Sequence, residues 1–222
     1  MSLRLVVFDV DGTLVDSGAM ILAGFQGAYA KRGIPCPGEA EIFSIIGLSL
    51  GVAVAQLSPG LSEAEQAGLV QAYREIYSAG RSAPPPPLFP GARAALDGLR
   101  ARPEVLLAVA TGKSRLGLDH VLAPHDLLGM FLSCQVSDNH PSKPHPSMLE
   151  AALAETGAEA AGAVMVGDTE YDMQMGRNAG FLNIGVSWGH HSAERLRAGG
   201  ADVVIDRFED LMPALDRLWA AA

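Results

Sequence analysis

The sequence has few cysteines, no excess of positive charge and no long uninterrupted apolar run. Its 222 residues contain two cysteines, Cys36 and Cys134, so a secreted fold held by a disulfide framework is not expected. We expect a buried thiol at each position. Lysine and arginine number 16 against 25 acidic residues, and the net charge of −9 argues against nucleic acid or an anionic membrane as a partner.

No apolar run approaches the length of a membrane span, and no charged-then-apolar leader precedes the first apolar run. We therefore expect a cytoplasmic protein. Hydrophobic residues make up 49% of the chain and charged residues 18%, which is typical of a globular protein with a sizeable core. The length allows one large domain, or one domain with a smaller insertion. The sequence does not specify the oligomeric state.

Short apolar runs alternate with helical patterns along most of the chain. Runs that are apolar on both faces are typical of buried parallel strands, and such strands alternating with helices predict a doubly wound, Rossmann-like α/β sheet. The predicted strands are 3–9, 105–111, 131–136, 163–168, 183–188 and 202–206. The predicted helices of this part are 91–101, 114–123, 146–156, 170–179, 192–198 and 208–220.

The segment 17–84 interrupts that alternation with helical spacing and no strand pattern. Ser62 and Glu65 form a capping-box pattern, which marks a helix start. A proline-rich run at 83–91 follows, and we interpret it as a stiff connector rather than as a ligand for a partner domain. The sequence thus predicts an all-helical domain at 17–84 inserted into an α/β core made of residues 1–16 and 85–222.

Polar residues follow several of the predicted strands at their carboxyl ends, where parallel α/β sheets bind ligands. Asp9, Asp11 and Thr13 follow the first strand, and Thr111, Gly112 and Lys113 follow the second. Lys143 lies in the loop after the third predicted strand, and Asp168 and Asp172 follow the fourth. Each group alone has a structural explanation as a turn, a solvated lysine or a helix cap. Together they predict one site that gathers acids, a hydroxyl and a cation, with a divalent cation or a shared proton offsetting the repulsion between carboxylates.

The segments DVDGTLVDS (9–17), TGK (111–113), SKPHP (142–146) and GDTEYDM (167–173) resemble, in order, the four motifs of the haloacid dehalogenase superfamily. The resemblance covers nearly the whole chain and includes a helical cap inserted after the first motif. It is strongest toward the phosphoglycolate phosphatase-like branch. It implies a phosphatase that uses Mg²⁺ to hydrolyse small phosphate monoesters through an aspartyl-phosphate.

The resemblance also implies roles for individual residues. Asp9 matches the nucleophile, Asp11 the general acid/base, Thr111 the phosphate-binding hydroxyl and Lys143 the cation that steadies both. Magnesium would be held by Asp9, the carbonyl of Val10 and Asp168, with Asp11 and Asp172 beside it. The expected contacts to the substrate are Thr111, Gly112 and Lys113, with Gly47 in the cap.

Several alternatives remain open from the sequence. A pyrophosphatase-like or a β-phosphoglucomutase-like enzyme would share the nucleophile, although the mutase typically carries a cap histidine that the stretch after the first motif lacks. A phospho-accepting receiver domain uses similar residues, but it is shorter, has no insertion and does not need Asp11. The natural substrate is not specified. Arg115 has no assigned role, and we expect His190 and His191 to form a solvated loop or a helix-start contact rather than a metal pair.

Overall fold

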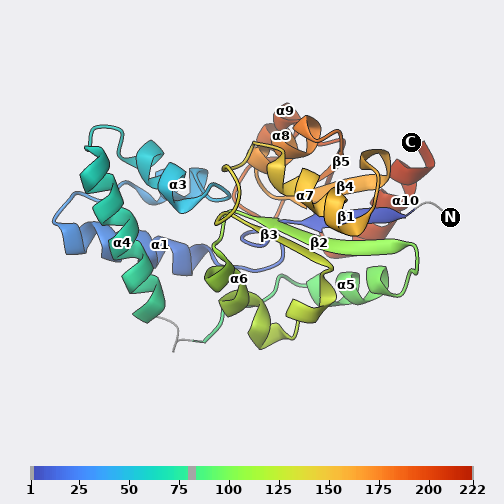
Figure 1. Ribbon diagram of the computed structural model, residues 1–222, viewed down its shortest axis with the longest axis horizontal. Coiled ribbons are helices and arrows are strands. Elements are labelled where there is room, and N and C mark those ends of the chain that lie inside the picture. The colour runs from blue at the N-terminus through green and yellow to red at the C-terminus, as the bar shows by residue number, and fades with distance from the viewer. Residues whose placement is uncertain (1–2, 80–83, 222) are drawn as a thin grey trace.

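The computed structural model describes residues 3–79 and 84–221, and within them six parallel strands form a single sheet in the spatial order β3-β2-β1-β4-β5-β6 (Figure 1). The strands are β1 (Arg4–Phe8), β2 (Val105–Thr111), β3 (Ser133–Val136), β4 (Ala163–Gly167), β5 (Leu182–Val186) and β6 (Val203–Ile205). These bounds agree with the predicted runs to within a residue or two. The predicted parallel α/β sheet is therefore confirmed.

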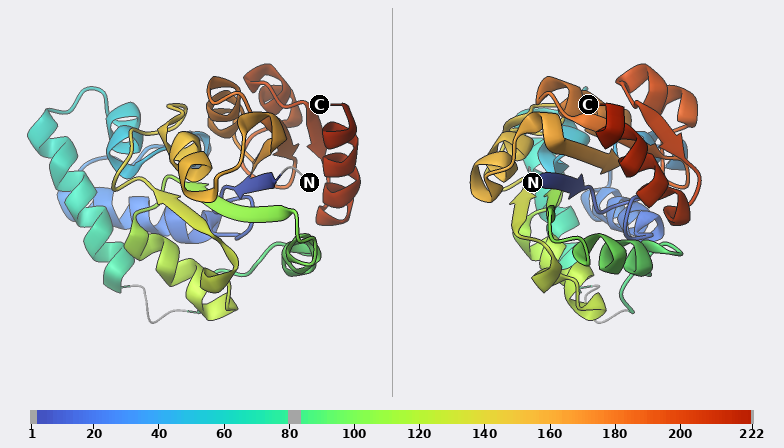
Figure 2. Two further views of the ribbon diagram at one scale, coloured as in Figure 1. Left: turned by 45° about the vertical axis from the view of Figure 1, so that its right-hand side comes forward. Right: turned by 90° about the vertical axis from the view of Figure 1, so that its right-hand side faces the viewer.

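Helices cover both faces of the sheet, as Figure 2 shows. They are α5 (Ala92–Arg100), α6 (Arg115–Leu122), α7 (Ser147–Thr156), α8 (Glu170–Asn178), α9 (Ala193–Gly199) and α10 (Leu211–Ala221). Alternate residues of each strand serve opposite faces: Val6 and Phe8 pack in the cluster that contains α5, α6 and α10, whereas Leu5 and Val7 pack in the cluster that contains α7. Burial on both faces explains why the strands read as continuous apolar runs.

The chain between β1 and α5 forms a separate helical part, seen at the left of Figure 1. Its helices are α1 (Gly18–Arg32), α2 (Glu39–Ser44), α3 (Leu50–Leu57) and α4 (Glu63–Ala79). They enclose a hydrophobic cluster of their own, which includes Phe25, Ile42 and Leu69. The expected capping box is confirmed, since the amide of Ser62 donates to Glu65 at 2.9 Å and the amide of Glu65 donates back to the Ser62 hydroxyl at 3.4 Å.

Two connecting segments join the helical part to the sheet and run beside each other. Val15 and Leu88 form an antiparallel bridge, and the amide of Phe89 donates to the carbonyl of Leu14. The described part of the proline-rich run, from residue 84, thus leads the chain back to the sheet beside the segment that follows β1. Its first residue, Ala83, lies outside the described residues.

The strand order places β1 in the middle of the sheet, between β2 and β4. The chain adds β2 and β3 on one side of β1 and then crosses over to add β4, β5 and β6 on the other. Ligands of such sheets bind beyond the carboxyl ends of the strands, at the point where the winding reverses. That point lies between the ends of β1 and β4, which is where Asp9 and Asp168 follow their strands.

The expectation of two buried thiols is wrong for Cys36. Its side chain is exposed in the loop between α1 and α2, and Cys134 is half-buried. Both cysteines are free thiols. Within residues 3–79 and 84–221, no helix combines the length and hydrophobicity of a membrane-spanning segment.

Candidate active site

The carboxyl ends of the three central strands bring together the side chains that the sequence placed there. Asp9 directly follows β1, Thr111 ends β2 and Asp168 directly follows β4. Phe8 is paired with Val109 on one side and with Val166 on the other, so the strands end at a common level. At most 1% of Asp9, Thr111 and Asp168 is exposed. Three polar side chains are thus held inside the protein where the predicted site lies.

Lys143 reaches this cluster from the loop between β3 and α7. Its ammonium group donates to Oδ1 of Asp9 at 2.7 Å and to Oδ1 of Asp172 at 2.6 Å. Burial would lower the pKa of Lys143, but the carboxylates of Asp172 and Asp9 outweigh it and raise the pKa above its ordinary value. Lys143 is therefore a permanent positive charge between two acids.

The acids around Lys143 exceed it in number. Potential ligand atoms of Asp9, Asp168 and Asp172 all lie within 4.8 Å of one another, and all three residues are buried. Burial raises the pKa of Asp9 well above its ordinary value; Asp172, Asp168 and Asp11 add to this, and Lys143 opposes it. Oδ2 of Asp9 is also buried without a hydrogen-bond partner. A cluster of carboxylates with one unpartnered oxygen and one lysine fits a divalent cation, which prefers such oxygen ligands.

Asp168 is fixed in place by groups from two loops. Thr13 donates from its hydroxyl to Oδ1 at 2.9 Å, and the backbone amide and the ring Nδ1 of His190 both donate to Oδ2 at 2.9 Å. Burial favours the neutral acid, but the contacts with His190 hold the pKa of Asp168 below its ordinary value. A carboxylate held ionised in this way retains a free lone pair on Oδ1 for a cation.

His190 was missed as a site residue, because a solvated loop or a helix-start contact was expected for this pair of histidines. The expectation holds only for His191, whose Nδ1 accepts the amide of Glu170 at the start of α8. Its Nε2 donates to the carbonyl of Ser44 at the end of α2 and so links the sheet part to the helical part. One signal could have identified His190: it follows β5, whose carboxyl end lies at the same edge as Asp168.

Asp172 has both oxygens occupied by protein groups. Oδ1 accepts from Lys143, and Oδ2 accepts from the amide of Thr169 at 3.0 Å and from its hydroxyl at 2.7 Å. These last contacts form the capping box that begins α8. Asp172 therefore holds Lys143 and the helix start, and Asp9 and Asp168 are better suited to bind a metal.

Asp11 lies apart from the acidic cluster. Its Oδ1 is 2.9 Å from the ammonium of Lys113 and accepts a hydrogen bond from the Ser17 hydroxyl. The carboxylate of Asp11 is therefore engaged with Lys113 and Ser17, and its expected place beside the metal stays a prediction. Lys113, expected to contact the substrate, is paired with Asp11, and both residues line the same cavity.

The carbonyl of Val10, expected to bind the metal, is also used by the protein. It accepts hydrogen bonds from the amides of Leu14 at 3.0 Å and Val15 at 2.9 Å. A carbonyl oxygen has two lone pairs, and the tight turn after β1 occupies both. The role of Val10 as a magnesium ligand stays a prediction, and Asp9 and Asp168 are the better-placed candidates.

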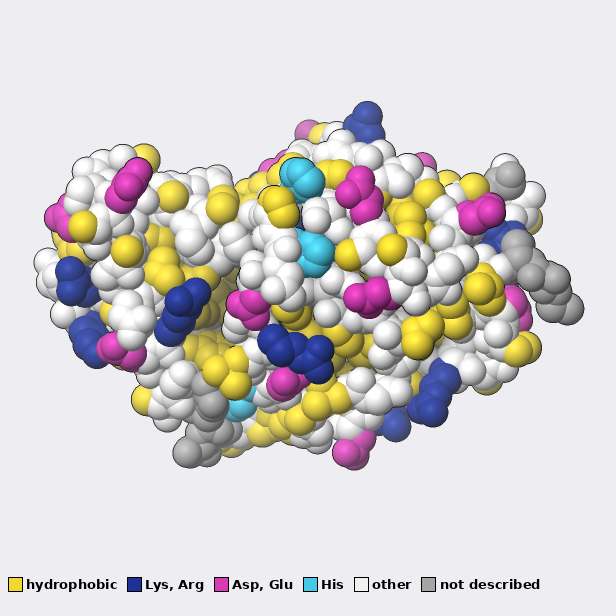
Figure 3. Space-filling model, viewed as in Figure 1, with side chains coloured by type: hydrophobic (Ala, Val, Ile, Leu, Met, Phe, Trp, Pro, Cys, Tyr) yellow, Lys and Arg dark blue, Asp and Glu magenta, His cyan; other side chains and the backbone are white. Residues whose placement is uncertain are grey.

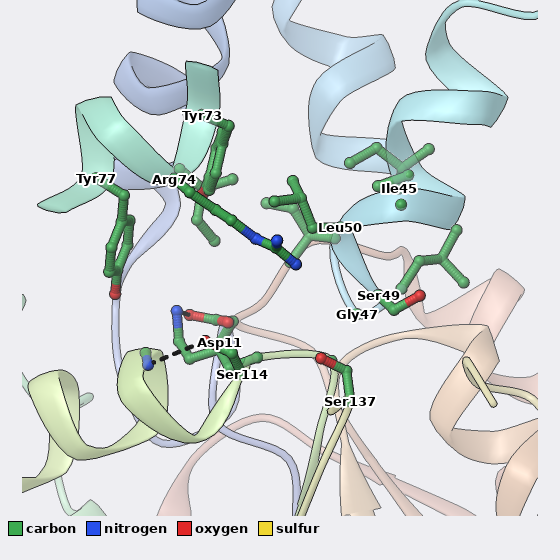
Figure 4. A pocket seen from close by; sticks show the side chains of 18 of the residues that line it. Asp11, Ile45, Gly47, Ser49, Leu50, Tyr73, Arg74, Tyr77, Ser114 and Ser137 are labelled. Carbon is green, nitrogen blue, oxygen red and sulfur yellow. Dashed lines mark hydrogen bonds and ion pairs between the residues drawn. The ribbon is translucent and has the colours of Figure 1, made fainter. Parts of the chain in front are cut away.

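A cavity of about 650 Å³ lies between the helical part and the sheet edge. Figure 3 shows the hollow from outside, with hydrophobic side chains along it, and Figure 4 shows it from close by. Asp9 and Asp11 line it from the sheet part, and Gly47, Leu50 and Arg74 line it from the helical part. It is large enough for a small-molecule ligand.

Two glycines allow the helical part to approach the sheet edge at this cavity. Gly47 has a φ of +99°, and a Cβ there would lie 3.0 Å from Oγ1 of Thr169. A Cβ on Gly112 would lie 2.6 Å from the carbonyl oxygens of both Gly47 and Leu48. The backbone at Gly47 therefore lies close to the sheet edge, and Gly112 is its counterpart on the sheet side.

Thr111 and Arg115 complete the set of predicted residues. Oγ1 of Thr111 accepts the amide of Lys113 at 3.2 Å and retains its own proton for donation. Arg115 is paired with Asp119 at 2.9 Å on the exposed surface of α6, which leaves it outside the site.

Comparisons with known proteins agree on one family. The family model described as "Haloacid dehalogenase-like hydrolase" matches residues 6–186. A protein of Dickeya dadantii named "Probable phosphatase IndB" is 34% identical, over 96% of this chain and 94% of its own length. A "Phosphoglycolate phosphatase" of Yersinia pseudotuberculosis is 30% identical, over the same shares. A solved haloacid dehalogenase-like hydrolase of Streptococcus pneumoniae is 25% identical, with a TM-score of 0.83 over 96% of this chain and 98% of that one.

Proposed function

The chain belongs to the haloacid dehalogenase-like hydrolase family, and we propose that it is a magnesium-dependent phosphatase that hydrolyses small phosphate monoesters through an aspartyl-phosphate on Asp9. The observation that carries this proposal is the contact of Asp9 with Lys143 at 2.7 Å. It lies inside a buried cluster of three acids, Asp9, Asp168 and Asp172, and this lysine. A carboxylate is thereby presented to a dianionic substrate beside a fixed positive charge.

In this proposal Asp9 attacks the phosphorus atom, and the bond from phosphorus to the ester oxygen breaks. Lys143 and the hydroxyl of Thr111 donate to the phosphate oxygens while charge is redistributed among them. Asp9 and Asp168 would hold Mg²⁺, which would supply positive charge and so reduce the repulsion between the nucleophile and the phosphate. Dividing the hydrolysis into two displacements at one carboxylate is the advantage of covalent catalysis.

Asp11 is proposed to move protons in both steps. It donates a proton to the departing alcohol and then accepts one from the water that hydrolyses the aspartyl-phosphate. Its place on the cavity wall supports this role, and Lys113 and Ser17 hold it there.

The segment 17–84 is proposed to be a cap domain that closes over the site and excludes water during the reaction. Its separate hydrophobic cluster and its paired connectors support this division from the core at 1–16 and 85–222.

Phosphoglycolate is the first substrate to test, because a relative with this named activity matches almost the whole chain. The exposed and half-buried free thiols suit a reducing compartment, so we propose that the activity belongs to the cytoplasm. Family membership over residues 6–186 does not favour a phospho-accepting receiver domain.

The test is a panel of phosphate metabolites, including phosphoglycolate, pyrophosphate and glucose 1-phosphate, assayed with Mg²⁺ and with a chelator. We expect release of inorganic phosphate that requires Mg²⁺. Small phosphate monoesters should show the highest kcat/KM in the panel. Preference for pyrophosphate would indicate the pyrophosphatase alternative, and isomerisation of glucose 1-phosphate without phosphate release would indicate the mutase. Absence of turnover on every member would overturn the proposal.

A further inference from the structure

The ring of His190 lies between the α/β core and the helical part. On the core side its Nδ1 donates to Oδ2 of Asp168 at 2.9 Å. From the helical part it meets Phe43 of α2, with the two ring centroids 5.5 Å apart and the ring planes tilted by 56°. The His190 side chain is 11% exposed. The orientation of this ring is therefore set from both parts of the molecule, although the carboxylate that it contacts belongs to the core.

The beginning of α1 also limits the space around the ring. A Cβ added at Gly18, the first residue of α1, would lie 3.2 Å from Nε2 of His190 and 3.8 Å from the ring of Phe43. Gly18 and Phe43 both belong to the segment 17–84. The helical part thus packs against the ring next to its second nitrogen, and close packing restricts the rotamers that a side chain can adopt.

Hydrogen bonds hold the end of α2 against the core beside this contact. The carbonyl of Ser44, the last residue of α2, accepts from the Tyr171 hydroxyl at 3.1 Å and from Nε2 of His191 at 3.2 Å. The last carbonyls of a helix have no partner inside the helix, so side-chain donors stabilise its end. Ser44 directly follows Phe43, and His191 directly follows His190. Docking at Ser44 therefore fixes Phe43 against His190.

This packing has a consequence for the acid beside it. Groups that orient a metal ligand affect the affinity for the metal almost as strongly as the ligand itself. Asp168 is oriented by Thr13 and His190, and His190 is oriented in turn by the docked end of α2. If the helical part moved away, the ring would lose the contact with Phe43 and the carboxylate of Asp168 would gain alternative orientations.

We propose that Phe43 is a positioning residue that the helical part supplies to the metal site: through His190 it holds Asp168 in the orientation that binds Mg²⁺. The proposal rests on the proposed magnesium site, and it adds a coupling between metal binding and docking of the helical part. Such coupling is reciprocal, so bound Mg²⁺ should strengthen the docking by the same factor. The helical part would then close more firmly over a site that holds its metal than over an empty one.

The first experiment measures Mg²⁺ affinity by calorimetry in a double-mutant cycle. The variants are Phe43→Ala, His190→Ala and both together, and Phe43→Leu keeps a hydrophobic side chain without the ring. The control is Leu57→Ala, which removes another partly buried hydrophobic side chain from the same helical cluster, at the end of α3. Neither Phe43 nor Leu57 belongs to the acidic cluster, so neither substitution removes a ligand.

We expect Phe43→Ala to weaken Mg²⁺ binding by about 3- to 10-fold, the range that corresponds to one aromatic ring contact. Phe43→Leu should lose less, and Leu57→Ala should match the wild type. In the His190→Ala background the change at Phe43 should have no further effect, because the ring that it positions is absent. Unchanged affinity in Phe43→Ala, or equal losses from this change in both backgrounds, would overturn the proposal.

The second experiment measures the reciprocal effect by hydrogen exchange at saturating Mg²⁺. The amides of Ile45 and Ile46 donate to the carbonyls of Ile42 and Phe43 at 3.4 and 3.3 Å, so their protection reports on the end of α2. We expect Mg²⁺ to slow exchange at these amides in the wild type and to slow it less in His190→Ala. Equal slowing in the two proteins would contradict the coupling.

The two experiments separate failure of this proposal from failure of the metal site. Mg²⁺ binding by the wild type that does not respond to Phe43→Ala would overturn the positioning role and leave the metal site intact. Absence of Mg²⁺ binding by the wild type would overturn the metal site and the positioning role together.

Discussion

The ammonium group of Lys143 lies 2.7 Å from Oδ1 of Asp9, although the two residues are 134 positions apart in the chain. The side chains are 0% and 1% exposed, so the contact is made away from water. A buried lysine that contacts two acids is strongly favoured in its charged form. Its loss would leave Asp9 and Asp172 buried without compensation.

Lys143→Met should therefore abolish turnover and lower the free energy of unfolding by about 3–5 kcal/mol, the usual cost of breaking a buried ion pair on one side. Urea denaturation measures this change. The matched control is Lys31→Met, which removes an ion pair whose side chains are 52% and 45% exposed and should cost about 1 kcal/mol or less. Similar losses in the two variants would contradict the assignment of Lys143 to a buried charge cluster.

The metal-free protein should become less stable as the pH rises, through Asp9. Because burial raises the pKa of Asp9, the folded protein binds a proton that the unfolded chain has released. The contribution of Asp9 is full below about pH 3.9, the ordinary carboxyl pKa, and is lost as the pH rises through its raised value. The measurement is Tm as a function of pH in the presence of a chelator. The difference between the wild type and Asp9→Asn gives the contribution of Asp9 to the pH dependence of stability.

Mg²⁺ should reverse that trend in the wild type, because it binds the folded protein with Asp9 ionised. We expect the increase in Tm on addition of Mg²⁺ to grow with pH and to be largely absent in Asp9→Asn. The same increase in both proteins, at every pH, would place the cation elsewhere.

The general position of the site was predictable, and the direction of several side chains was not. Asp9, Lys143 and Asp168 meet because carboxyl ends of adjacent parallel strands and the loops after them share one edge, which the order of apolar runs already indicates. The turn of Asp11 toward Lys113 and Ser17 depends on loop conformation and on the cap, which a spacing rule does not describe.

The contacts of His190 and Val10 also depend on loop conformation, which the sequence does not give. The position of His190 after β5 places it at the same edge of the sheet as Asp168, but the sequence does not specify the loop conformation that brings its ring into contact with that carboxylate. The carbonyl of Val10 accepts two amides of the turn after β1, and that hydrogen bonding is visible only in three dimensions.

His190→Ala should weaken Mg²⁺ binding by about 10- to 100-fold, the usual effect of removing a group that orients a metal ligand. The ring of His190 donates to Oδ2 of Asp168, and the alanine variant loses that contact while its backbone amide remains. Calorimetric titration with Mg²⁺ measures the affinity. His125→Ala is the control, since that histidine contacts the carbonyl of Pro86 instead. Equal affinities in the two variants would argue against Asp168 as a ligand.

Gly112→Ala should impair catalysis without unfolding the protein. The added Cβ would lie 2.6 Å from the carbonyl oxygens of Gly47 and Leu48, so the cap loop must move away from the sheet edge. We expect kcat/KM to fall by about tenfold or more, as misplacement of a positioning element does, with circular dichroism unchanged. Gly98→Ala is the control: a Cβ there meets nothing within 4 Å, and alanine in α5 should add about 0.5–1 kcal/mol of stability. Full activity of Gly112→Ala would contradict a close cap contact.

The most direct test of the account is to locate the phosphoryl group during turnover. Asp11→Asn is mixed with Mg²⁺ and p-nitrophenyl phosphate, whose leaving group needs little protonation, and is then quenched in acid and mapped by mass spectrometry. Because Asp11 is proposed to activate the water of the second step, the variant should accumulate phosphate on the peptide that contains Asp9, and Asp9→Asn should show none. Release of nitrophenol with no phosphate on Asp9, or with phosphate on another residue, would contradict the account.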